Sequence, residues 1–213
     1  MNKNKINLLK YDSVLFDLGG VILNLDYDLT VNAFKSLGQE RFDNLYTQAS
    51  QDFIFDKFET GIISSIEFID YMLSLLPKEC SSADVVIAWN LMLLDLPKKR
   101  IDFLKQLSLK MPINLFSNTN DLHFKSFTKY FINEFGDENL LNSMFNKCYY
   151  SHLVGERKPN SAAFQLVLDE QGLDPEKVLF IDDSIQHIEG ANKLGIKTHH
   201  LVDSDICDIL TFS

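Results

Sequence analysis

The chain contains few cysteines, three in 213 residues, and their positions exclude two kinds of site. Cys80, Cys148 and Cys207 are an odd number, lie far apart and include no C-x-x-C pair. A disulfide framework uses an even number of cysteines and a zinc site uses closely spaced ligands, so the sequence indicates neither. Unpaired thiols are typical of a reducing compartment, and we therefore expect a cytoplasmic protein.

Basic residues are also scarce, because 20 lysines and arginines stand against 30 aspartates and glutamates, giving a formal net charge of −10. Such a field repels nucleic-acid phosphates and anionic lipids, so we expect neither nucleic acid nor a membrane as a partner. An anionic substrate would need a metal ion or a few cations to reverse the field locally. Lys10, Asp12 and Asp17 interrupt the apolar stretch near the N-terminus, which therefore matches neither a signal peptide nor a spanning helix.

The residues that are plentiful are those of a globular protein, with 46% hydrophobic and 12% aromatic. At ~150 residues per domain, the length predicts one domain or one domain with an insertion. Apolar runs without polar alternation predict strands buried on both faces of a parallel sheet. These runs cover residues 14–16, 113–116, 148–151, 178–181 and 199–202. Helical spacing at residues 101–111, 124–131 and 164–168 alternates with them, which predicts an α/β fold.

The stretch from about residue 26 to 97 breaks this alternation, because it contains only helical patterns. Apolar residues recur at helical spacing over residues 66–76 and 85–93. A polar segment after Leu25 and the charged, proline-containing run at residues 96–100 mark its ends. We therefore predict a helical cap at residues 26–97, inserted into a core of residues 1–25 and 98–213.

Polar residues follow the predicted strands at the sheet edge where open parallel sheets bind ligands. Asp17, Asp182 and Asp183 are the hard oxygen ligands that Mg²⁺ prefers. Ser117 and the residues after it stand at a predicted helix N-terminus, a place that accepts phosphate, and Lys158 is a cation that could hold the same group. Taken singly, each also has an ordinary explanation as a turn, a helix cap or a surface lysine.

Assembled in order, these segments resemble four motifs of the haloacid dehalogenase (HAD) superfamily of phosphatases. The segments are FDLGGV at 16–21, LFSNTN at 115–120, GERKP at 155–159 and FIDDS at 180–184. The resemblance spans nearly the whole chain and implies a three-layer Rossmann-like core with a helical C1 cap. The sequences of these segments are most similar to those of the branch that contains sugar-1-phosphate phosphatases and the phosphatase domain of soluble epoxide hydrolases.

The resemblance implies phosphoryl transfer through an aspartyl-phosphate on Asp17, with Lys158 as a second catalytic residue. The Mg²⁺ ligands that it implies are Asp17, the carbonyl oxygen of Gly19, Asp183 and, directly or through water, Asp182. The groups implied to bind the phosphoryl oxygens are Ser117, the backbone N–H of Asn118 and Lys158.

One position departs from the family pattern. Most phosphatases of the superfamily carry a second aspartate two residues after the nucleophile as general acid and base, and here that residue is Gly19. Such assistance contributes about 10²–10⁴-fold, so we expect a slow enzyme, one that needs good leaving groups, or one that borrows an acid. Some members of the sugar-1-phosphate branch share the glycine. Candidates for a borrowed acid are the cap residues Asp26, Asp28 and Glu59.

The leading hypothesis is a Mg²⁺-dependent phosphatase of a small phosphomonoester, such as a sugar phosphate, with residues 55–63 shaping specificity. Haloacid dehalogenation is an alternative that also lacks the second aspartate, but it needs no metal, so the pair Asp182 and Asp183 counts against it. A third possibility is a catalytically silent relative that binds a phosphorylated metabolite or a protein partner. The histidines show no metal spacing, and we expect His152 to be a structural residue with satisfied hydrogen bonds. The physiological substrate and the oligomeric state stay open.

Overall fold

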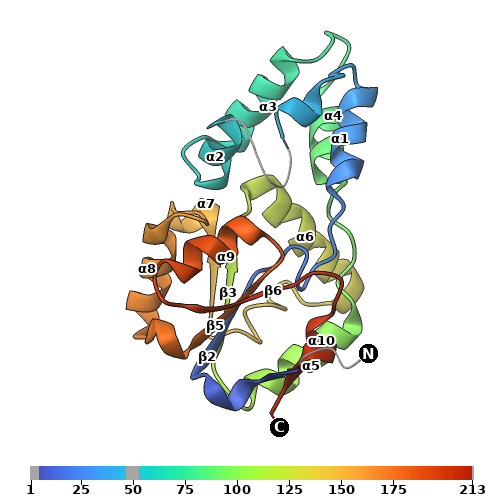
Figure 1. The fold of residues 1–213 in the computed structure, drawn as a ribbon. Helices are drawn as coiled ribbons and strands as arrows, with labels where there is room; N and C mark the ends of the chain where they lie inside the picture. The colour runs from blue at the N-terminus through green and yellow to red at the C-terminus, as the bar shows by residue number, and fades with distance from the viewer. Residues whose placement is uncertain (1–4, 47–52, 213) are drawn as a thin grey trace.

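The computed structural model describes residues 5–46 and 53–212, so residues 47–52 of the predicted cap lie outside the described part. Its centre is a sheet of five parallel strands in the order β4-β3-β2-β5-β6, which confirms the predicted α/β fold (Figure 1). The strands are β2 (Ser13–Phe16), β3 (Ile113–Ser117), β4 (Lys147–Tyr150), β5 (Val178–Asp182) and β6 (Lys197–His200). The strands β1 (Ile6–Asn7) and β7 (Leu210–Thr211) form a separate parallel pair.

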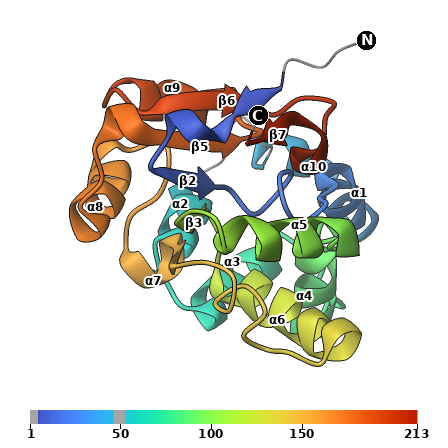
Figure 2. The same cartoon turned by 90° about the horizontal axis from the view of Figure 1, so that it is seen from below.

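Helices cover both faces of the five-stranded sheet, which explains why its strands show no polar alternation. One face packs on α5 (Lys98–Ser108), α6 (Asp121–Phe135) and α10 (Ile206–Ile209). The other packs on α8 (Ser161–Gln171) and α9 (Ile185–Asn192) (Figure 2). The short helix α7 (Ser151–Val154) follows β4. The described residues also form 3₁₀ turns at Leu8–Lys10, Phe42–Asn44 and Pro175–Lys177.

The sequence misplaced the last strand of the sheet. The prediction covered residues 199–202, whereas β6 runs from Lys197 to His200. Strand β5 ends at Asp182, which is opposite His200, so Leu201 and Val202 have no further strand residue to pair with. The predicted strand at 148–151 is also displaced by one residue, because Ser151 begins α7.

The segment between β2 and α5 forms the helices α1 (Tyr27–Ser36), α2 (Phe53–Glu59), α3 (Ser65–Ser74) and α4 (Ser82–Asn90). They lie beyond the carboxyl ends of the strands (Figure 1). They carry an apolar core of their own, rich in stacked aromatic rings. Ser64 and Ser81 begin α3 and α4 with capping boxes, which satisfy the first free N–H groups of each helix. Among the described residues, no helix combines the length and the apolar character needed to cross a bilayer.

Candidate active site

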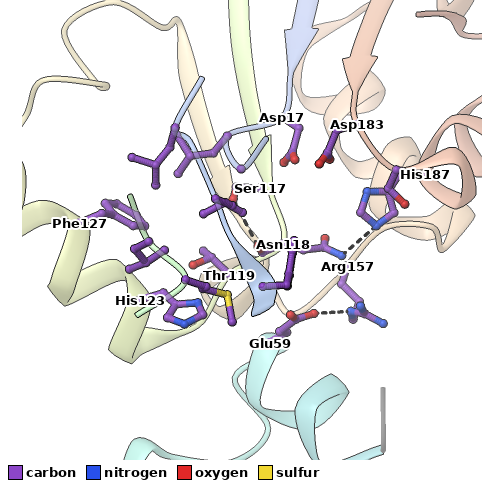
Figure 3. Close-up of a pocket in the computed structure, with 18 of the residues that line it drawn as sticks. Asp17, Glu59, Ser117, Asn118, Thr119, His123, Phe127, Arg157, Asp183 and His187 are labelled. Atoms are coloured by element: carbon purple, nitrogen blue, oxygen red, sulfur yellow. Dashed lines mark hydrogen bonds and ion pairs between the residues drawn. The ribbon is translucent and has the colours of Figure 1, made fainter. Parts of the chain in front are cut away.

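The carboxyl ends of β2, β3 and β5 bring the predicted site residues to one place. Phe16 pairs with both Leu115 and Ile181, and the N–H of Asp17 donates to the carbonyl of Ile181 over 2.9 Å. The residue after each strand therefore reaches the same edge of the sheet. A pocket forms there between the sheet edge and the helical segment from β2 to α5, which we call the cap below (Figure 3). The predicted residues that line it are Asp17, Gly19, Ser117, Asn118, Asp183 and Glu59.

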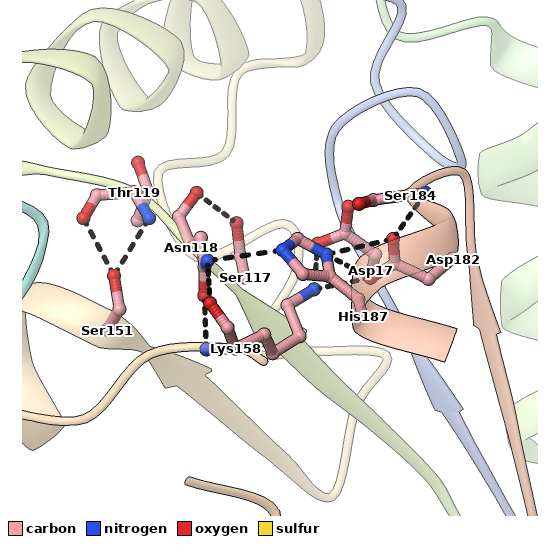
Figure 4. Close-up of polar contacts among 9 residues, drawn as sticks. All are labelled: Asp17, Ser117, Asn118, Thr119, Ser151, Lys158, Asp182, Ser184 and His187. Carbon is pink, nitrogen blue, oxygen red and sulfur yellow. Dashed lines mark hydrogen bonds and ion pairs between the residues drawn. The ribbon is translucent and has the colours of Figure 1, made fainter. Parts of the chain in front are cut away.

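Lys158 lies directly behind this pocket and is fully buried. Its Nζ donates to Oδ1 of Asp17 and to Oδ2 of Asp182, each over 2.7 Å (Figure 4). Burial alone would lower the pKa of Lys158, but the two carboxylates raise it above its usual value. The structure therefore holds an ammonium group against the predicted nucleophile.

The loop that carries Lys158 is clamped to the end of β3. The N–H of Lys158 donates to Oδ1 of Asn118 over 2.9 Å, and Nδ2 of Asn118 donates to the carbonyl of Lys158 over 2.8 Å. The N–H of the next residue, Thr119, donates to Oγ of Ser151 over 2.9 Å. These bonds use the Asn118 side chain for positioning, so only its backbone is left for the predicted phosphate contact.

Asp182 and Asp183 are neighbours in sequence but face different partners. Asp182 is fully buried, and besides Lys158 it accepts bonds from the N–H of Ser184 over 2.8 Å and from Nδ1 of His187 over 3.0 Å. Burial would raise the pKa of Asp182, but Lys158 and His187 lower it well below its usual range. Asp183 instead lines the pocket beside Asp17 (Figure 3). Asp182 thus holds Lys158, and Asp183 is the more accessible carboxylate.

The three aspartates present a donor set that fits Mg²⁺. Carboxylate oxygens of Asp17, Asp182 and Asp183 lie within 4.8 Å of one another. Burial raises the pKa of Asp17 to about 7, Lys158 opposes this rise, and the two other aspartates add to it. A cation would favour the ionised form of all three groups. A β-carbon at Gly20 would lie 2.1 Å from Oδ2 of Asp183, so the glycine leaves the space that this carboxylate occupies.

The structure also shows what stands where the family's second aspartate would be. A β-carbon added to Gly19 would lie 2.5 Å from Cδ1 of Leu25, so an apolar side chain occupies that space. Of the three candidate acids, Asp26 caps α1 by accepting the N–H of Asp28 over 3.0 Å, and Asp28 itself is exposed. Only Glu59 lines the pocket.

Several pocket residues had no role predicted from the sequence, among them Arg157, His187 and Tyr27. Arg157 lies directly before Lys158, and its Nε donates to Oε2 of Glu59 over 2.8 Å (Figure 3). His187 lies in the first turn of α9, three residues after the N-cap Ser184, and this closeness to the end of β5 could have placed it near the acidic pair. Tyr27 follows the polar segment after Leu25, and no sequence pattern identified it as a pocket residue.

The expectation for His152 was wrong. This side chain lies beside Phe124 and Tyr150, outside the pocket lining. Its Nδ1 is buried and has no hydrogen-bond partner among the described residues, so the histidine is structural but not satisfied.

The parallel sheet, the cap and the four motif segments at one edge define a class of hydrolase. Residues 11–195 match the model of the haloacid dehalogenase-like hydrolases. Since this match covers most of the chain, the protein belongs to the HAD-like hydrolase family.

Particular relatives extend the match over nearly the whole chain. The chain is 29% identical over 187 residues to a D-ribitol-5-phosphate phosphatase of Bacteroides thetaiotaomicron, covering 87% of this chain and 89% of the relative. It is 33% identical, with a TM-score of 0.83, to an aspartate-to-alanine variant of an HAD family enzyme from the same species, solved with magnesium and inorganic phosphate. That match covers 92% of this chain and 96% of the other. A predicted HAD-like family hydrolase from Porphyromonas gingivalis is 26% identical, with a TM-score of 0.78, over 89% of this chain and 90% of the other.

Proposed function

We propose that the protein is a Mg²⁺-dependent phosphatase that hydrolyses a small phosphomonoester through an aspartyl-phosphate on Asp17. The observation that carries the proposal is the buried Lys158 ammonium between Asp17 and Asp182, beside a pocket lined by Asp183 and Ser117. The relative named as a phosphatase and the similar structure with magnesium and inorganic phosphate support the same chemistry.

The carboxylates of Asp17 and Asp183 and the carbonyl of Gly19 would hold the ion, with Asp182 acting through Lys158 or through water. When bound, Mg²⁺ supplies positive charge that offsets the repulsion between the carboxylates and the phosphoryl oxygens. Ser117 and the N–H of Asn118 would bind those oxygens. Lys158 holds one oxygen of Asp17 and so orients the carboxylate toward its target.

In the first step an oxygen of Asp17 attacks phosphorus, and the ester P–O bond breaks with its electron pair on the alcohol oxygen. In the second step water attacks the phosphorus of the aspartyl-phosphate, which releases inorganic phosphate and restores the Asp17 carboxylate. Gly19 has no proton to give to the leaving alcohol. We therefore propose that alkyl phosphates are hydrolysed slowly and phosphates of acidic alcohols faster.

We further propose a sugar phosphate or sugar-alcohol phosphate as the substrate, because the phosphatase relative acts on D-ribitol 5-phosphate according to its name. The separate aromatic core between β2 and α5 supports a cap of residues 26–97 over a core of residues 1–25 and 98–213. The three cysteines are unpaired, which supports a reducing compartment such as the cytoplasm.

The test is release of inorganic phosphate from p-nitrophenyl phosphate with Mg²⁺, with EDTA, and in the Asp17→Asn variant. We expect Mg²⁺-dependent release that EDTA and the substitution abolish, while Asp12→Asn, at an exposed position, behaves as wild type. Halide release from a haloacid without metal would indicate the dehalogenase instead. Binding of phosphate without turnover would indicate the silent relative, and full activity of Asp17→Asn would refute the mechanism.

A further inference from the structure

The cap side of the pocket carries charged groups that the proposed reaction does not use. Glu59, at the end of α2, lines the pocket and is about 8% exposed. Arg157, from the loop before α8, lines the same wall. Its Nε donates to Oε2 of Glu59 over 2.8 Å, and its Nη1 donates to Oδ1 of Asp56 over 2.7 Å. The cap thus contributes one carboxylate, Glu59, to the pocket lining, with Asp56 bonded to the same guanidinium outside the lining.

The guanidinium of Arg157 still has donors to offer. A guanidinium carries five N–H groups, and its Nε and Nη1 use one each for the two carboxylates. Within the described part of the chain, its Nη2 donates to no protein acceptor. A carboxylate beside such donors suits an alcohol, because a hydroxyl both donates and accepts.

The charge of the same wall disfavours an anion. Glu59 in the lining and Asp56 just outside it together outweigh Arg157 by one negative charge. Among the described residues between β2 and α5 that line the pocket, the other ionisable groups are Tyr27 and Tyr46, and burial raises the pKa of both phenols, so they remain neutral hydroxyls. A second phosphate or a carboxylate on the substrate would meet net negative charge there, at low water content.

We propose that Glu59 and Arg157 recognise hydroxyl groups on the carbon chain of the substrate, so that the enzyme selects neutral, polyhydroxylated phosphomonoesters and rejects those with a second anionic group. The inference rests on the proposed phosphatase function and names the substrate class of that site.

A matched set of substrates tests the selection on the wild-type enzyme. The set is a five-carbon polyol 5-phosphate, its analogue without the two hydroxyls furthest from the phosphate, and its analogue with the far carbon oxidised to a carboxylate. The leaving oxygen has the same neighbours in all three, so differences in kcat/KM report on the far end. We expect the deoxy and the carboxylate analogues to be about 10- to 100-fold poorer, the range for hydrogen bonds to charged groups.

Two variants assign the selection to Glu59. Glu59→Gln keeps the shape but removes the charge, and we expect the discrimination against the carboxylate analogue to fall at least about fivefold. Glu59→Ala removes the acceptor, and we expect the preference for the polyol over the deoxy analogue to fall about tenfold or more. Glu134→Gln and Glu134→Ala, at an exposed position on α6, are matched controls that should keep the wild-type ratios.

The outcomes separate the two proposals. Absence of phosphate release from any phosphomonoester would refute the proposed function itself. Release from p-nitrophenyl phosphate together with equal kcat/KM for the three analogues would refute only the hydroxyl recognition, as would wild-type ratios in Glu59→Gln. If circular dichroism shows that Glu59→Ala does not fold, the kcat/KM ratios of the wild type and of Glu59→Gln still test the hydroxyl recognition.

Discussion

The adjacent glycines Gly19 and Gly20, which follow Asp17 closely, show how much a single side chain can change at this site. Gly20 has φ +71°, a conformation that strains any other residue, and its α-carbon faces the Asp183 carboxylate. Gly19 faces Leu25 instead. Gly19 therefore leaves room for an apolar side chain, and Gly20 leaves room for a carboxylate that the proposed ion would need.

We expect Gly20→Ala to impair the metal site beyond the cost of backbone strain. Its β-carbon would lie 2.1 Å from Oδ2 of Asp183, so this carboxylate has to move. Gly136→Ala is the matched control, because Gly136 has φ +70° and a β-carbon there would meet no atom within 4 Å. Backbone strain alone should cost each variant about 1 kcal/mol of unfolding free energy, and Gly20→Ala should lose more because of the clash with Asp183. Only Gly20→Ala should raise the Mg²⁺ concentration needed for phosphate release, and an unchanged Mg²⁺ requirement would contradict the assignment of Asp183.

Restoring an aspartate at position 19 should fail unless Leu25 is also changed. The β-carbon of Gly19→Asp would lie 2.5 Å from Cδ1 of Leu25, so we expect a lower unfolding midpoint and no gain in rate. In Gly19→Asp combined with Leu25→Ala, the new carboxyl group has space and can protonate a leaving alcohol. For each variant we compare kcat/KM for an alkyl phosphate with kcat/KM for p-nitrophenyl phosphate. We expect this ratio to be about 10²-fold higher in the double variant than in Leu25→Ala alone. An equal ratio in these two variants would show that another acid already serves.

At the scale of helices, α4 of the cap is joined to α6 of the core by a buried polar network. The ring of His123 stacks on Trp89 with 4.9 Å between centroids, and its Nε2 lies 3.0 Å from the carbonyl of Trp89. Asn120, the N-cap of α6, accepts the N–H of His123 over 3.0 Å and the indole N–H of Trp89 over 3.3 Å. The joint therefore depends on a neutral imidazole.

This joint should weaken in acid. Burial lowers the pKa of His123 from 6.5 to about 4. Between these two values the unfolded chain binds a proton that the folded protein does not, so the free energy of unfolding should fall as pH falls, by about 2 kcal/mol from pH 7 to 5. Urea unfolding at several pH values measures the slope, and His123→Phe should flatten it. Trp89, the single tryptophan, reports on the folded state: an emission change centred near pH 6.5 instead of 4 would contradict the assignment.

The sequence predicted these elements unevenly, for physical reasons. Strands β2, β3 and β5 were found because both of their faces are covered, so their residues before the site are apolar except for the buried Ser13 and Asn114. Strand β6 was displaced because its side chains are only half buried and its pattern is weak. Helices α1 and α2 of the cap were not resolved separately, since their packing partners are other cap helices far along the chain.

The residues of the candidate site were likewise predictable from the sequence only in part. Asp17 and Asp182 stand at the ends of buried strands, so the change from apolar to acidic residues there identified them as candidate site residues. Lys158 is 141 residues from Asp17 and 24 from Asp182, so only the family resemblance connected the three. The pairing of Arg157 with Glu59 spans 98 residues and depends on how the cap sits over the core, which no local pattern encodes.

At the scale of the whole molecule, one buried arginine ties three distant parts of the chain together. Nε of Arg100, at the start of α5, donates to Oδ2 of Asp205 over 3.0 Å. Its Nη1 donates to the carbonyl of Ile22 and to Oδ1 of Asn24, both over 2.9 Å. These contacts join the C-terminal helix α10, which Asp205 caps, to both connections between cap and core. The linkers also pair directly, because Leu25 bridges Leu93.

We expect Arg100→Met to destabilise the entire fold by up to about 3–5 kcal/mol, the range for breaking a buried ion pair, because Ile22 and Asn24 also lose their donor while Lys99 still contacts Asp205. Lys99→Met is the matched control, because Lys99 contacts the same Oδ2 of Asp205 over 2.9 Å but its side chain is 59% exposed, where solvent screens the pair. Denaturant unfolding followed by circular dichroism compares the two. Equal losses would place the stabilisation in the Asp205 charge alone, whereas the larger loss in Arg100→Met assigns it to the buried bonds that hold the linkers against the core.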